Sequence, residues 1–117
     1  MSDTIESLLK DGKLKTTMLQ VKLLKQIALN SYIIADTSMA AILDIKDAPS
    51  HSKYLIAGNW YKLIKCQKEN TNTVKLNIQF KPIKTVAKDD LPDLSAVVTK
   101  LESSVETSAT SIKYENF

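Results

Sequence analysis

The sequence predicts an all-β domain with small α content: a five-stranded barrel followed by a C-terminal α-helix. Three observations support this fold class. Short apolar runs rich in β-branched and aromatic residues recur between residues 19 and 80, and each is too short for a stable helix. Polar turns, with two glycines in the whole chain, separate these runs. After Lys88 the apolar residues take up helical spacing instead.

We expect one domain, because 117 residues can form a single core. Its predicted parts are an N-terminal arm or short helix (1–12), the barrel (13–88), the C-terminal helix (89–105) and a flexible tail (106–117). In the first part, Ile5, Leu8 and Leu9 fall on one side of a helical turn, which we expect Gly12 to end. The tail is polar and rich in Ser and Thr.

The first strand is predicted within residues 13–27. Leu19, Val21 and Leu23 alternate there with polar residues, as in a strand with one buried face. Leu24 breaks the alternation, which indicates a bulge or bend. A helix is the competing interpretation, but the Thr and Val residues in this stretch disfavour it.

A β-hairpin is predicted next, and we regard it as the centre of the fold. Residues 32–35 and 40–45 are apolar runs, and Asp36, Thr37 and Ser38 lie between them. Asp and Ser favour turns because their side chains bond nearby backbone amides. A loop with Pro49 and a short helical turn at 53–57 then lead to the next strand.

Two further strands are predicted after the loop. The fourth covers residues 60–66, and the fifth shows the cleanest alternation in the chain. Its apolar positions are Val74, Leu76, Ile78 and Phe80, with polar and basic residues between them. We therefore expect Phe80 in the core, and we expect Pro82 to end the strand.

The C-terminal helix has Asp90 as its predicted cap or Pro92 in its first turn. Its apolar stripe consists of Leu94, Val97, Val98, Leu101 and Val105. Two destinations are open for this stripe: it contacts helices of a partner subunit, or it folds back and plugs its own barrel.

Charge is divided unevenly along the chain. Residues 13–88 carry thirteen Lys against four acidic residues, a net charge of +9, whereas 1–12 carry −2 and 89–117 carry −4. A basic body between acidic ends indicates a polyanionic partner, with a solvated lysine surface as the alternative. All sixteen basic residues are Lys, which contacts phosphates but lacks the planar fork that reads guanine.

The order of these elements is typical of an OB-fold barrel. The run IIADTSMAAILDIKD resembles the strand–Asp–turn–strand segment of OB domains that bind single-stranded DNA, such as those of replication protein A, SOSS-B and telomere-capping proteins. YLIAGNWYKLIKC resembles their next segment, and the resemblance covers about residues 13–83. Ser38-Met39 stands where the family usually has a glycine. The resemblance implies nucleic-acid binding or assembly with other OB-fold subunits.

Single strands are held by stacking on aromatic rings and by lysines along the phosphates. The aromatic candidates are Tyr32 and Trp60. Trp60 and Tyr61 must face opposite sides of their strand, and we expect Tyr61 to point inward and Trp60 outward. The alternatives are core packing for Tyr32 and packing under a loop or interface for Trp60. The lysines expected to point outward are Lys22, Lys46, Lys62, Lys75 and Lys81.

Catalysis is not expected. His51 is the single histidine and lies in a loop without nearby metal-ligand types, and Cys66 is a lone cysteine on a strand pattern, typical of a buried apolar residue. Asp44 and Asp47 are a poor acid–base pair, and no glycine-rich phosphate loop occurs. We expect no cofactor, no metal, no membrane span and no secretory signal, and therefore an intracellular location, with the nucleus favoured.

The sequence-based hypothesis is a protein that binds single-stranded DNA or RNA, as a small subunit of a replication, repair or telomere-type complex. Its other OB-fold subunits would be bound through the C-terminal helix. The alternative is an OB module that binds proteins and no nucleic acid. The sequence leaves open which nucleic acid is preferred.

Overall fold

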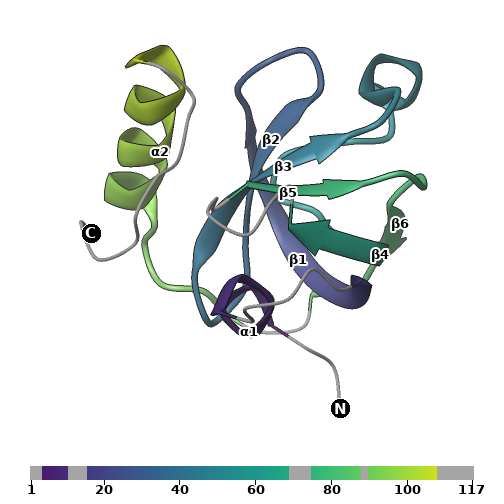
Figure 1. The fold of residues 1–117 in the computed structure, drawn as a ribbon, viewed down its shortest axis with the longest axis horizontal. Coiled ribbons are helices and arrows are strands. Elements are labelled where there is room, and N and C mark those ends of the chain that lie inside the picture. Colours follow the sequence, from purple (N-terminus) through teal and green to yellow (C-terminus); the bar gives the residue numbers. More distant parts are fainter. Residues whose placement is uncertain (1–3, 11–15, 69–74, 88–89, 108–117) are drawn as a thin grey trace.

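The computed structural model describes residues 4–10, 16–68, 75–87 and 90–107, and at Thr16 and 104–107 it describes the backbone alone. Five strands close into a barrel: β1 (Thr16–Gln26), β2 (Ser31–Ala35), β3 (Ala40–Ile45), β4 (Trp60–Lys68) and β5 (Lys75–Ile78). Their order is β1-β2-β3-β5-β4, and β4 pairs back with β1 (Figure 1). Only β3 and β5 pair in parallel among the described strands. The predicted fold class is confirmed, and the strand order is compatible with an OB-like fold.

The hairpin and the bend in β1 form where the sequence predicts them. Ser31 pairs with Asp44 at one end of the β2–β3 hairpin, and Ala35 pairs with Ala40 at the other. In β1 the register shifts between Leu23 and Lys25, so Leu24 is the extra residue of a bulge. The bulge turns Leu24 away from the inner core and lets β1 reach both β2 and β4.

The predicted fifth strand is shorter in the structure, and a sixth strand follows it. β5 ends at Ile78, whose carbonyl accepts the Lys46 N–H at 3.2 Å. After a bend, β6 (Ile83–Thr85) pairs with β4. Phe80 therefore lies outside any strand and is 51% exposed, so its prediction as a core residue is wrong. Alternation predicts an inward side chain only within a strand, and β5 ends two residues before Phe80.

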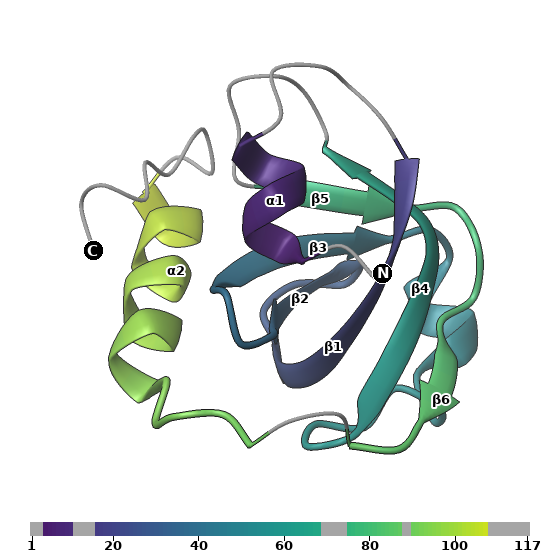
Figure 2. The same ribbon diagram turned by 90° about the horizontal axis from the view of Figure 1, so that it is seen from below.

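Two short helical elements contribute to the inner core. The helix α1 (Ile5–Lys10) lies across one end of the barrel (Figure 2), where Ile5 and Leu8 are fully buried in the inner cluster. The 3-10 helix Ala48–His51 lies in the β3–β4 connection and buries Ala48 in the same cluster. It begins with Pro49 in its first turn, where a fixed φ suits a helix, so the helical turn predicted at 53–57 forms earlier in the chain.

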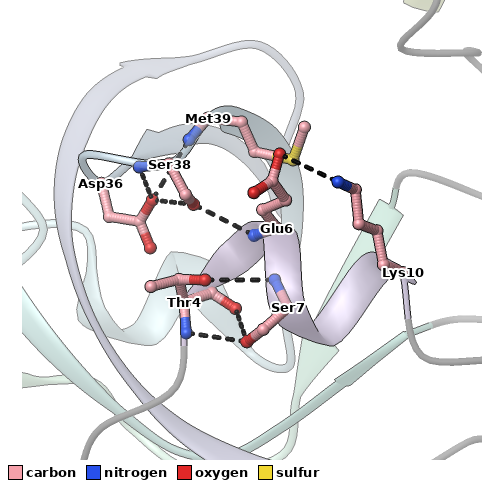
Figure 3. Close-up of polar contacts among 7 residues, drawn as sticks. All are labelled: Thr4, Glu6, Ser7, Lys10, Asp36, Ser38 and Met39. Atoms are coloured by element: carbon pink, nitrogen blue, oxygen red, sulfur yellow. Dashed lines mark hydrogen bonds and ion pairs between the residues drawn. The ribbon is translucent and has the colours of Figure 1, made fainter.

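Asp36 and Ser38 join the hairpin turn to α1, and Figure 3 shows the bond between Ser38 and Glu6. The Asp36 carboxylate accepts the Ile5 N–H at 2.8 Å and, within its own turn, the N–H groups of Ser38 and Met39. The Ser38 hydroxyl in turn accepts the Glu6 N–H at 3.0 Å. These bonds satisfy amides of the first helical turn that have no partner within the helix. Asp36 is 8% exposed, so its hydrogen bonds are largely shielded from water.

The C-terminal helix α2 (Ser95–Thr107) stands against the outside of the barrel (Figure 1). It begins later than predicted: the N–H and hydroxyl of Ser95 both donate to the Asp93 carboxylate, and Val98 N–H donates to the Leu94 carbonyl. The Ser95 hydroxyl first, and its N–H second, hold the pKa of Asp93 below its ordinary value. The tail was predicted to begin at residue 106, but the helix backbone continues to Thr107, and residues 108–117 lie outside the described residues.

Candidate nucleic-acid interface

The two predicted stacking residues are both buried. Tyr32 is 3% exposed and belongs to the inner cluster, where burial, and secondarily the neighbouring Tyr61, raises its pKa. Tyr61 points inward, as predicted. Trp60 lies on the opposite face of β4 but is only 5% exposed, between its strand partners Lys22 and Thr85. The expectation that Trp60 is open to solvent is wrong, because β6 adds a neighbour that the sequence did not reveal.

The five predicted lysines do not form one continuous track. Lys46 and Lys81 are exposed, whereas Lys22, Lys62 and Lys75 are half-buried. The Lys75 ammonium lies 3.0 Å from the Asp44 carboxylate, so its charge is already paired. Lys22 borders a groove between β1 and α2. Lys46 and Lys81 are therefore the members of the set best placed to meet a ligand.

The outer face of the β2–β3 hairpin is covered by α2. Ile33, Ala35, Ala40 and Ile42 form that face, and together with Leu101 of α2 they make a second buried cluster. The other described residues of the predicted partner stripe, Leu94, Val97 and Val98, pack against it half-buried, and the side chain of Val105 lies outside the described residues. α2 thus folds back onto its own barrel, the second of the two destinations left open, but it packs on the outer wall and does not plug the barrel. The helix that covers a barrel end is α1.

Aromatic and basic side chains gather around the connection between β5 and β6, all of them exposed except Tyr54, which is half-buried. The Lys65 ammonium lies 5.7 Å from the centroid of the Phe80 ring, and the Lys81 ammonium lies 4.2 Å from that of Tyr54. Both are within the range of a cation–π contact. The Tyr54 hydroxyl accepts the N–H of Lys84 in β6. We call this set the Lys–aromatic surface: Tyr54, Lys65, Phe80, Lys81 and Lys84.

The backbone under this surface is fixed by two features of β4. Tyr61 donates its hydroxyl to the Tyr54 carbonyl at 2.5 Å and accepts the Ile56 N–H at 2.9 Å, which ties the preceding loop to the barrel. At Lys65, φ is 54°, a left-handed conformation within a register irregularity between β1 and β4. Bulges of this kind redirect side chains, and here the lysine is directed toward Phe80.

Sequence reasoning missed Tyr54, Lys65, Phe80 and Lys84 as members of one surface. The available signal was local: Phe80 is flanked by Lys81, and Pro82 breaks the strand pattern directly after them. That signal indicates a turn that presents an aromatic ring. The contributions of Tyr54 and Lys65 depend on tertiary contacts, which no local pattern encodes.

Among the described residues, no group of three or more His, Cys, Asp or Glu side chains is arranged to hold a metal ion. Within the same residues, no helix has both the length and the apolar character needed to cross a membrane. The described lysines Lys46, Lys65, Lys81 and Lys84 form no ion pair with any described residue.

The lone thiol is buried and should be inert. Cys66 is fully buried in the inner cluster, and this burial raises the pKa of its thiol from 9.0 to about 12. We expect N-ethylmaleimide to leave the native protein unlabelled at pH 8 and to label it in urea, as measured by mass spectrometry. Because the folded pKa is the higher one, the thiol's contribution to stability is complete below pH 9 and is lost between pH 9 and 12. Rapid native labelling would contradict this placement.

Comparison with known proteins identified no relative of this chain. No protein-family model, no curated protein and no solved structure matches the chain.

Proposed function

We propose that this protein is a non-enzymatic OB-fold protein that binds single-stranded nucleic acid, as a small subunit of a complex that maintains DNA or RNA. A single barrel offers a short binding site, which favours action beside other subunits. Replication, repair and telomere protection, in the nucleus, are the settings in which such a subunit would serve.

The observation that carries the proposal is the unbalanced charge of the barrel. Residues 13–88 contain four acidic residues. The Asp36 carboxylate accepts hydrogen bonds from backbone amides. The Asp44 carboxylate pairs with the Lys75 ammonium and accepts the Ser31 hydroxyl. Asp47 is exposed, and Glu69 lies outside the described residues. Exposed lysines on the barrel thus have few acidic neighbours, and a polyanion would supply the missing charge.

The kind of polyanion is suggested by the aromatic residues among these lysines. Phe80 is half exposed, and an exposed ring beside ammonium groups suits unpaired bases, whose faces are free to stack. Bases in a duplex are already stacked on one another. The OB-like strand order supports the same proposal, since barrels of this type bind oligonucleotides.

A protein-binding module without nucleic acid is the second candidate. It is favoured by one observation: α2 covers the β2–β3 face, the face with which OB barrels usually hold oligonucleotides. In that case the lysines would be a solvated surface.

A titration separates the two candidates. A fluorescently labelled 12-nucleotide oligo-dT is titrated with the protein at several salt concentrations, with a duplex of equal length as control. We expect tighter binding of the single strand, and an affinity that falls linearly on a log–log plot against salt. Absence of binding at low salt would contradict the proposal and favour the protein-binding module.

A further inference from the structure

We infer that the single strand is bound on the Lys–aromatic surface, with a base stacked on Phe80 and phosphates at Lys65, Lys81 and Lys84. This inference rests on the proposed function and assigns it a site. The site lies around the β5–β6 connection, away from the β2–β3 face that the barrel type would suggest.

Phe80 is suited to receive a base. Its ring is 51% exposed and lies in a bend held between β5 and β6, so its backbone is anchored on both sides. The Lys65 ammonium lies 5.7 Å from the ring centroid, near the outer limit of a cation–π contact. Such a loosely held ammonium can move to a phosphate when a base takes the ring face.

Tyr54 has a different role, because its ring is already in use. Lys81 lies over it at 4.2 Å, and Tyr61 packs against it with a centroid distance of 5.6 Å and an interplanar angle of 62°. The Tyr54 hydroxyl also accepts the Lys84 N–H. Tyr54 therefore positions Lys81 and β6, and Phe80 is the stacking residue.

The basic residues lie on the segments next to Phe80, and one of them, Lys65, reaches its ring. Lys81 follows Phe80 directly, Lys84 follows in β6, and Lys65 reaches the ring from β4. Lys46 lies close by, since its N–H donates to the carbonyl of Ile78, two residues before Phe80. Phosphates on either side of a stacked base would meet these ammonium groups.

The β2–β3 outer face offers no equivalent. Its buried side chains are two Ile and two Ala residues, none of which can stack as an aromatic ring, and Leu101 covers them. A strand would have to displace α2 to reach this face. Of the lysines beside it in β1, Lys25 is already paired with Glu102 of α2 and Lys22 is half-buried. Because the cations of the Lys–aromatic surface are all Lys, we expect recognition of the backbone and of any base, with little preference for sequence.

Substitution of Phe80 tests the stacking. In the full-length protein, Phe80→Leu should weaken oligo-dT binding about tenfold, the usual scale for the loss of one stacked base. Phe80→Tyr keeps an aromatic ring and should bind like the wild type. Leu29→Ala is the matched control, since Leu29 is 69% exposed in the β1–β2 connection and should have no effect. Unchanged melting temperatures would show that all three variants are folded.

Substitution of the lysines tests the phosphate contacts. Each of Lys65→Gln, Lys81→Gln and Lys84→Gln should reduce the slope of log Kd against log salt by about 0.7, the value for one phosphate contact on a single strand. Lys25→Gln should leave the slope unchanged, because the Lys25 ammonium is already paired with Glu102 of α2.

The outcomes separate the site from the function. If the wild type binds oligo-dT and Phe80→Leu binds equally well, the site is wrong while the proposed function stands. If the wild type does not bind, the proposed function itself fails. Binding of anionic phospholipid vesicles in place of the oligonucleotide, with the same dependence on Phe80, would overturn the inference in favour of a lipid surface.

Discussion

Replacing Asp36 by Ala should lower the free energy of unfolding by about 3 kcal/mol, a large part of the stability of a small domain. The substitution removes a buried carboxylate that accepts the N–H groups of Ile5, Ser38 and Met39. Those amides would lose their partners, and α1 would lose its attachment to the hairpin. Because Ile5 and Leu8 of α1 are fully buried in the inner core, that core would be opened at one end.

Urea denaturation followed by the fluorescence of Trp60, the single tryptophan, measures this loss. Thr37→Ala is the matched control, because Thr37 lies in the same turn with an exposed side chain. A loss from Asp36→Ala no larger than that from Thr37→Ala would show that the turn does not hold α1.

Replacing Leu101 by Asp should release α2 from the barrel. Leu101 is completely buried among Ile33, Ala35, Ala40 and Ile42, and a carboxylate there would lose its hydration without gaining a partner. The inner cluster shares no residue with this outer one, so the strands should stay folded. The uncovered apolar face should then bind a hydrophobic dye and cause self-association.

Hydrogen exchange measures separately whether α2 is released and whether the barrel strands stay folded. Amides of α2 should lose their protection in Leu101→Asp while those of β1 and β4 keep theirs. Ala96→Asp places the same charge at an exposed position of α2 and should change neither. Loss of protection throughout the barrel would mean that α2 is an integral part of the fold.

Local patterns predicted the elements of this fold well. The hairpin, the bulge at Leu24 and the inward phase of Tyr61 depend on alternation and turn chemistry, which act over a few residues. The apolar stripe of α2 was equally readable. A stripe shows that a helix has an apolar face, however, and does not show which surface that face meets.

The failures concern contacts between distant segments. Trp60 was expected on the surface, and its burial follows from β6, a strand of three residues that has no recognisable pattern. Phe80 was expected inside, and its exposure follows from the end of β5 at Ile78, beside Lys46. The attachment of α1 to Asp36 joins residues 31 positions apart. In each case tertiary packing determined the outcome.

In the proposed mode of binding, Phe80 takes the stacking role that the sequence had suggested for Trp60. Trp60 is a covered residue of the barrel wall, and Phe80 presents its ring to solvent beside lysines. Because α2 covers the β2–β3 face, a strand bound in the proposed way and any partner of α2 would meet different sides of the molecule.

The most direct test of this account is an NMR titration of the ¹⁵N-labelled full-length protein with unlabelled oligo-dT. We expect the largest shifts at the amides of Lys65, Phe80, Lys81 and Lys84, and small shifts in α2 and at the outward positions of β2 and β3. The largest shifts at Ile33, Ile42 and Leu101 would contradict the account, because they would place the strand on the face that α2 covers.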